Sequence, residues 1–174
     1  MQSKTPTGSA VTLGRLMGPQ DANSLGNVHG GVIMKMVDEA GALAAMRHSG
    51  GPVVTVSIDT MSFQKPIYVG QLVVLRAELT YAGKTSMEAR VEVQAENPFQ
   101  AGDITHTNLA YVVYVAIDSD GKPRTVPPLE AENEAQALRM EQAGKRQAFR
   151  KQQHEAERLA QQVSDRDAKG NPHD

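Results

Sequence analysis

The sequence predicts a single α+β domain in which a curved antiparallel sheet wraps one long central helix, followed by a C-terminal helical extension. Residues 32–47 are apolar or small at nearly every position, so a helix formed there has to be covered by other elements. The strand-like segments that follow are joined by short turns without a second helix between them. This order favours antiparallel pairing over a βαβ repeat.

Composition sets the outer bounds of the interpretation. With 174 residues, 40% hydrophobic and 22% charged, the chain fits one soluble domain. Cysteine is absent, which excludes disulfides, thiolate catalysis and cysteine-based metal sites. The net charge of −2 gives no electrostatic case for nucleic acid or an anionic membrane as partner. Neither an apolar leader nor a run of about 18 apolar residues is present, so we expect a cytoplasmic protein without a membrane span.

The first half of the chain alternates between short elements and one long one. Residues 1–9 are polar and are expected to be flexible. Residues 10–17 predict a first strand, a polar loop covers 21–31, and the helix of 32–47 ends at the glycine- and proline-bearing stretch 48–52. Within the helix, Lys35 and Glu39 mark the one solvated stripe and are spaced to form a surface pair.

The second half of the chain supplies the rest of the sheet and then becomes rich in charged residues. Strands are predicted over 53–62, 72–81, 85–95 and 105–117, with 82–84 as a hairpin turn. These elements complete a domain of residues 10–128. Residues 129–163 are rich in Glu, Gln, Arg and Ala, which predicts a charged helical extension, and 164–174 are expected to be disordered.

The junction between loop and helix carries the strongest candidate site. Gly30 and Gly31 lie where the helix begins, and backbone N–H groups at a helix N-terminus favour an oxygen with negative charge. Asp38 lies about two turns further, at the edge of the apolar arc, where a carboxylate needs a function, a partner or a subunit boundary. A structural or interface acid remains the alternative, and the two glycines could simply permit a tight junction.

Two further residues of the loop extend this site. The Asn23 amide could hold a water or polarise a carbonyl, although an asparagine in a loop also forms turns. His29 stands alone, because no other histidine has ligand spacing to it, so no metal site is expected. The serines lack the context of a nucleophile elbow, which disfavours a Ser-His-Asp enzyme.

Several runs in this order and spacing resemble one enzyme family. They are G-P-Q-D-A-N-S-L-G-N-V-H-G-G-V-I-M-K-M-V-D-E-A-G-A-L-A-A-M-R-H, then F-Q-K-P-I-Y-V-G, L-T-Y-A-G-K-T-S-M-E and V-P-P-L. Together they are similar to the hotdog-fold acyl-CoA thioesterases, especially the cytosolic, brain-type long-chain branch. The resemblance covers roughly residues 12–130, and it implies hydrolysis of fatty acyl-CoA to free fatty acid and CoA.

The resemblance also assigns roles. It implies a catalytic pair of Asn23 and Asp38, contributed by different subunits of a dimer, with the Gly31 N–H stabilising the oxyanion. Three such dimers are expected to form a hexamer, and CoA enters only as part of substrate and product, without a cofactor. Contacts to the substrate or its CoA portion are expected from His29, Gly30, Lys84, Thr85 and Ser86.

Two rival functions stay open from sequence alone. A hotdog-fold hydratase or dehydratase would use a histidine with an acid for work on an α-proton, and His29 with Asp38 could fill those roles. A non-catalytic acyl-CoA-binding protein would use the same domain without turnover. Neither the acyl chain length nor the choice between general base and nucleophile for Asp38 follows from the sequence.

Overall fold

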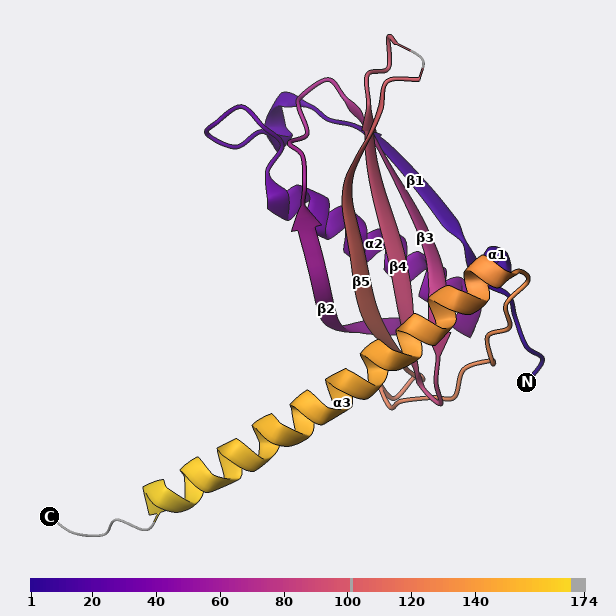
Figure 1. Cartoon of the computed structure of the whole chain (residues 1–174), viewed down its shortest axis with the longest axis vertical. Helices are drawn as coiled ribbons and strands as arrows, with labels where there is room; N and C mark the ends of the chain where they lie inside the picture. The colour runs from indigo at the N-terminus through magenta and orange to yellow at the C-terminus, as the bar shows by residue number, and fades with distance from the viewer. Residues whose placement is uncertain (101, 170–174) are drawn as a thin grey trace, which may run out of the picture.

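The computed structural model describes residues 1–100 and 102–169, with side chains as far as residue 162 (Figure 1). Five antiparallel strands form one sheet, and a long helix packs on each of its faces. Two short helical segments precede the first of these long helices. This arrangement confirms the predicted α+β class. In sheet order the strands are β1 (Val11–Leu16), β3 (Leu72–Ala82), β4 (Ser86–Glu96), β5 (Ile104–Ala116) and β2 (Val53–Phe63). The helical elements are α1 (Pro6–Ser9), η1 (Pro19–Asp21), α2 (Gly30–Ser49) and α3 (Glu134–Lys169).

The core lies between α2 and the face of the sheet that curves around it (Figure 1). Alternate residues of the strands point into this layer, as expected for a sheet with one face against a helix. At Gly41 the helix and the sheet lie close together, because the hydroxyl group and ring of Tyr114 on β5 occupy the space that a Cβ atom would need. The buried core includes Ile33, Val37, Ala40, Ala44, Val73, Leu75, Leu79, Met87, Ala89, Val91, Val93, Ala110, Val112 and Tyr114.

Helix α2 begins and ends close to the predicted points. It begins two residues before the expected start because the His29 side chain caps it, and it ends at Gly50, which adopts the left-handed conformation at φ 73°. The Lys35–Glu39 pair forms at 3.7 Å. The solvent-exposed side of α2 is wider than the predicted stripe, because Met34, Leu43 and Met46 are exposed as well. The side of α2 away from the sheet therefore carries exposed apolar side chains as well as charged ones.

The N-terminal segment, for which we expect flexibility over residues 1–9, makes long-range contacts. Lys4 donates to the carbonyl oxygens of Arg47 (3.0 Å) and His48 (2.7 Å), which are free at the C-terminal end of α2. Lys4 also forms a β-bridge with Leu129. Ser9 hydrogen-bonds the buried His48 ring at 3.1 Å.

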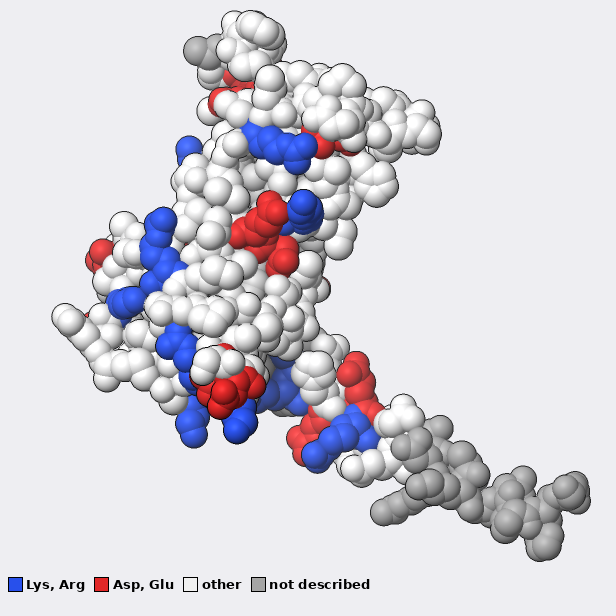
Figure 2. All heavy atoms as spheres, turned by 180° about the vertical axis from the view of Figure 1, so that it is seen from behind, with Lys and Arg blue, Asp and Glu red and all other residues white. Residues whose placement is uncertain are grey.

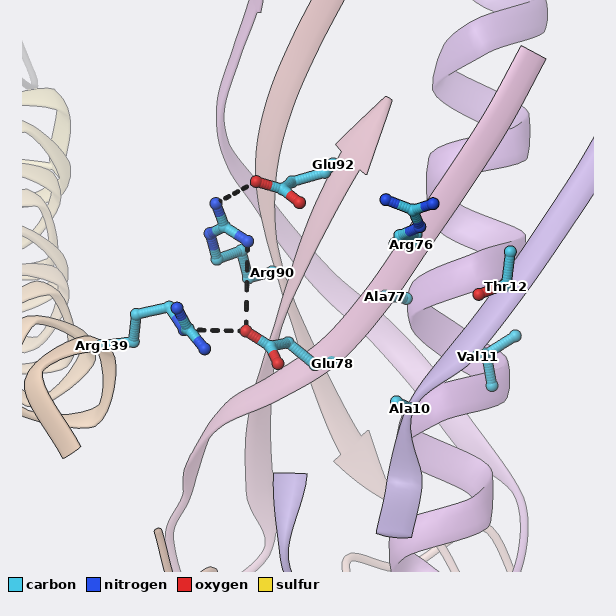
Figure 3. Close-up of a pocket in the computed structure, with 9 residues that line it drawn as sticks. All are labelled: Ala10, Val11, Thr12, Arg76, Ala77, Glu78, Arg90, Glu92 and Arg139. Carbon is cyan, nitrogen blue, oxygen red and sulfur yellow. Dashed lines mark hydrogen bonds and ion pairs between the residues drawn. The ribbon is translucent and has the colours of Figure 1, made fainter. Parts of the chain in front are cut away.

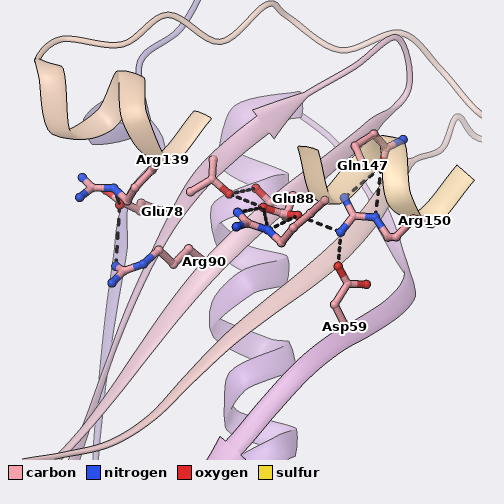
Figure 4. Close-up of polar contacts among 9 residues, drawn as sticks. Asp59, Glu78, Glu88, Arg90, Arg139, Gln147 and Arg150 are labelled. Carbon is pink, nitrogen blue, oxygen red and sulfur yellow. Dashed lines mark hydrogen bonds and ion pairs between the residues drawn. The ribbon is translucent and has the colours of Figure 1, made fainter. Parts of the chain in front are cut away.

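The predicted C-terminal helical extension is α3, and it crosses the face of the sheet opposite α2 (Figure 1). Its first half is held by Glu88, a fully buried β4 carboxylate that pairs with Arg146 at 2.7 Å and Arg150 at 2.9 Å (Figure 4). From residue 151 to 162 every side chain is exposed. The helix continues to Lys169, into the segment 164–174 for which we expect disorder, and residues 170–174 lie outside the described residues.

Candidate active site

The loop that precedes α2 is closed at its base by Asp21, a buried residue that the sequence analysis did not single out. Its carboxylate accepts a hydrogen bond from the Gly18 N–H at 2.9 Å and pairs with Arg15 at 2.5 Å. Its carbonyl oxygen accepts from the His29 N–H at 2.7 Å, which joins the two ends of the loop. Because charge-assisted bonds are among the stronger ones, Asp21 fixes the loop against the start of the helix.

Asn23 shapes this loop and keeps donors free. Its Oδ1 accepts hydrogen bonds from the N–H groups of Leu25 (2.9 Å) and Asn27 (3.2 Å), as in an Asx turn. The turn-forming alternative therefore applies within a single chain. Across the described residues no acceptor faces the Asn23 amide nitrogen, so its two N–H groups can still donate to a ligand.

The first turn of α2 is capped by its own histidine. The Gly31 N–H donates to His29 Nδ1 at 2.9 Å, so the predicted oxyanion donor is already engaged. A substrate oxygen can take that N–H only when the His29 ring turns away. Gly30 lies against the Phe63 ring, and a Cβ there would come within 3.3 Å of it, which accounts for a small residue at this position.

Asp38 is half-buried on α2 and is held by two strands. Thr55 of β2 donates to Asp38 Oδ1 at 2.7 Å. Tyr114 of β5 donates to the Asp38 carbonyl oxygen at 2.9 Å and lies 3.3 Å from the same Oδ1. No hydrogen bond or ion pair from the described residues reaches Oδ2. The acid predicted from the helix pattern thus has one anchored and one free oxygen.

The predicted catalytic pair does not meet within one chain. Asp38 lies eight positions after Gly30, about 12 Å along the helix, and its contacts go to Thr55 and Tyr114 instead of to Asn23. This geometry agrees with the implication that the two residues serve different subunits, but a single chain does not test it.

The hairpin expected to contact CoA lies at the other end of the molecule. Ser86 pairs with Val115, and the Thr85 carbonyl accepts from the Ala116 N–H, next to the C-terminal end of α2. A helix of 20 residues spans about 30 Å. Within one chain, Lys84, Thr85 and Ser86 are therefore not brought together with the loop at the start of α2.

A cavity of about 310 Å³ lies elsewhere and is lined mainly by charged and polar residues (Figure 3). It lies on the sheet face that carries α3, away from Asp38. Its charged walls are mostly paired: Arg90 lies 2.5 Å from Glu92 and 4.0 Å from Glu78, and Arg139 lies 2.8 Å from Glu78. An acyl chain needs apolar walls, so this cavity is not the acyl site.

Among the described residues, no group of three or more His, Asp or Glu side chains is placed to hold a metal ion. No helix in that part of the chain is long and apolar enough to cross a bilayer.

Comparisons with known proteins place these features in a family. Residues 25–99 match the family model of the thioesterase superfamily. The chain is 38% identical over 130 residues to the cytosolic acyl coenzyme A thioester hydrolase of Mus musculus, covering 70% of this chain but only 34% of that protein. It is also 38% identical over 127 residues to the acyl-CoA thioester hydrolase YciA of Salmonella typhimurium, covering 71% of this chain and 93% of that protein.

Solved structures extend the similarity to nearly the whole chain. An acyl-CoA hydrolase of Staphylococcus aureus, solved with butyryl coenzyme A and coenzyme A, superposes with a TM-score of 0.84 at 32% identity over 93% of this chain and 99% of that one. Variants of that hydrolase, with alanine in place of an aspartate, an asparagine or a threonine, have also been solved. A hexameric acyl-CoA thioesterase gives a TM-score of 0.84 at 36% identity, covering 88% and 98% of the two chains.

The fold and these matches define a hotdog-type acyl-thioester enzyme. The chain belongs to the thioesterase superfamily, among the acyl-CoA thioester hydrolases. The family and fold expected from the sequence are confirmed. The residue roles that the resemblance implied remain predictions.

Proposed function

We propose that the protein hydrolyses fatty acyl-CoA to free fatty acid and CoA, with Asp38 as general base or nucleophile. The observation that carries this proposal is the half-buried Asp38 carboxylate, anchored through Oδ1 by Thr55 and open at Oδ2. The three positions replaced in the Staphylococcus aureus variants have the same spacing as Asn23, Asp38 and Thr55 here. This agreement supports the choice of residues.

In this mechanism the thioester carbonyl oxygen lies at the N-terminus of α2. The Gly30 N–H, and the Gly31 N–H once His29 turns away, would stabilise the negative charge that develops on that oxygen. The Asn23 amide would donate to the carbonyl or to the attacking water. Asp38 Oδ2 would take a proton from that water, or attack directly to give an anhydride that water then cleaves. In both routes the C–S bond breaks, and CoA leaves as a thiol after protonation.

The site is shared between two subunits in this proposal, because Asn23 and Asp38 do not meet within one chain. Strand β2 is an edge of the sheet, and a second β2 can extend the sheet there. The uncovered side of α2 beside it carries exposed Met34, Leu43 and Met46. Figure 2 shows the molecule from this side, where residues other than Lys, Arg, Asp and Glu cover most of the surface around a few charged side chains. We propose a dimer with two sites, three of which assemble into a cytoplasmic hexamer like the hexameric relative.

In such an assembly the CoA contacts of Lys84, Thr85 and Ser86 would come from a neighbouring subunit, since the hairpin lies far from its own loop. Lys84 is exposed and free to reach a phosphate. A Lys84→Ala variant should raise KM for acyl-CoA with little change in kcat. An unchanged KM would remove Lys84 from the site.

The central experiment mixes two inactive variants. Asp38→Ala and Asn23→Ala should each lower turnover by about two orders of magnitude or more, scored as thiol release from acyl-CoA. If the site is shared, a mixed dimer holds one site with both native residues, so unfolding and refolding the two variants together should restore activity. A site within one chain gives no recovery. Near-normal turnover of Asp38→Ala alone would reject the catalytic assignment.

The rivals give different signals in the same assay. A hydratase changes enoyl absorbance without releasing thiol, and a binding protein retains acyl-CoA without turnover.

A further inference from the structure

Tyr114 is a fully buried side chain on β5 whose hydroxyl group meets the turn of α2 that carries Asp38. It donates to the Asp38 carbonyl oxygen at 2.9 Å and lies 3.3 Å from Oδ1. The Ala42 N–H, one turn further along the helix, also faces the phenol oxygen. A buried tyrosine hydroxyl needs partners, and here they all belong to this one turn.

Gly41 makes this contact possible. A Cβ atom at position 41 would lie 2.4 Å from the Tyr114 hydroxyl oxygen and 3.1 Å from two ring carbons. Real atoms do not approach so closely, so any larger residue has to push the hydroxyl away from Asp38. Gly41 lies in the middle of a helix, where glycine is less favourable than alanine. The close approach of Tyr114 gives a physical reason for accepting that cost.

The Tyr114 hydroxyl group is suited to remain a hydrogen-bond donor at any working pH. Burial, with the nearby charge of Asp38 and the hydrogen bond to it, raises the pKa of Tyr114 far above its usual range. The phenol therefore stays protonated throughout the range in which an enzyme works. Its proton is directed at the oxygens of Asp38, next to the bond that Thr55 donates to the same Oδ1.

We propose that Tyr114 and Gly41 form a positioning pair that fixes the Asp38 carboxylate, so that Oδ2 is the oxygen that acts on the substrate. This inference rests on the proposed role of Asp38 as base or nucleophile. Phenylalanine would fill the core at position 114 almost as well, because it lacks only the hydroxyl. What tyrosine adds is the contact to Asp38.

The test is a double-mutant cycle of Tyr114→Phe and Gly41→Ala, measured as kcat and KM for thiol release. Each single change should lower kcat by about tenfold or more, the rate equivalent of one hydrogen bond to a charged group, with KM unchanged because neither residue touches acyl-CoA. Once the hydroxyl is gone, adding Gly41→Ala should cost much less. A merely structural role predicts that the two changes couple only in thermal stability, with kcat kept at temperatures where each variant is fully folded.

Matched controls come from the other face of the sheet and from α3. Tyr111→Phe removes a hydroxyl on β5 away from Asp38, and Gly144→Ala adds a methyl group in open space, so both should keep the native kcat. Should Gly41→Ala fold poorly, Tyr114→Phe alone decides. Native kcat in Tyr114→Phe, with Asp38→Ala inactive, overturns this inference only. Native kcat in Asp38→Ala overturns the proposed mechanism instead.

Discussion

Under the proposed mechanism the Asp38 carboxylate needs a fixed orientation and a free oxygen. Its two oxygen atoms, Oδ1 and Oδ2, supply one each. Oδ1 receives the Thr55 hydroxyl at 2.7 Å, which fixes the orientation of the carboxylate. Oδ2 keeps its lone pairs available for a proton or a carbonyl carbon. A carboxylate with both oxygens bonded would be better stabilised and less reactive. The structure thus gives the two carboxylate oxygens different surroundings, and the proposed mechanism uses this difference.

The sequence was enough to propose Asp38 as the candidate acid, but not to predict which residues contact it. Asp38 stands out because a helix that is apolar on most sides carries one acid at the edge of its apolar arc. Thr55 and Tyr114 reach it from two strands, and their positions depend on the register that pairs Thr55 with Tyr114. Register shifts after Thr55 and after Ile58 break the simple alternation, so the sequence pattern did not indicate this meeting.

His48 is the residue at which we expect stability to depend on pH. Its ring is buried between Ser9 and the Pro127 carbonyl oxygen, which Nε2 meets at 2.8 Å. Burial lowers the pKa of His48 below its ordinary 6.5; the charge of Lys4 lowers it further, and the bond to Pro127 opposes the shift. Below pH 6.5 the unfolded chain therefore binds more protons at this residue than the folded chain.

The predicted outcome is a thermal midpoint that stays at its full value above pH 6.5 and falls as the pH drops below it. Replacing His48 with Gln should lower stability at neutral pH but reduce this dependence on pH. His154→Gln is the control, because that side chain is exposed on α3. Thermal melts from pH 8 to pH 5 test the point, and parallel curves for His48→Gln and the native chain would contradict it.

At the scale of elements, α3 shows how a charged helix docks on a sheet. Arg146 stacks 3.8 Å from the centre of the Tyr111 ring, and both Arg146 and Arg150 reach the buried Glu88. Thr80 donates a further bond to Glu88 at 2.7 Å. Composition predicts the helix, but the anchor depends on a single buried acid in β4, which has no signature in the sequence of a strand.

Replacing Glu88 with Gln should therefore weaken the attachment of α3. Breaking a buried pair leaves cationic side chains without their partner and costs about 3–5 kcal/mol. Urea denaturation should show this loss, and limited proteolysis should cleave α3 faster than in the native chain. Glu141→Gln provides the control, since its pair with Lys145 is on the exposed side of α3 and should leave the midpoint unchanged. Equal stability of Glu88→Gln and the native chain would mean that α3 is held by packing alone.

At the scale of the whole molecule, the two faces of the sheet are covered to different extents. One face carries α2, and the opposite face carries the docked half of α3 (Figure 1). The outer side of α2 is left uncovered, although it displays apolar side chains next to the edge strand β2. The overall layout could be predicted from the alternation of apolar segments. The apolar outer side of α2 could not, because helical periodicity alone does not tell which apolar positions face the sheet.

If that surface is the contact between subunits, placing charge on it should separate them. Leu43 and Met46 are 44% and 38% exposed in the single chain, so changing both to Glu should cost little in folding yet oppose burial against a second copy. We expect smaller particles by light scattering and a loss of thiol release, since a lone chain holds only half of each site. Leu138→Glu, on an exposed α3 residue, should change neither property. A double variant that is monomeric and hydrolyses acyl-CoA at the native rate would show that each chain carries a complete site.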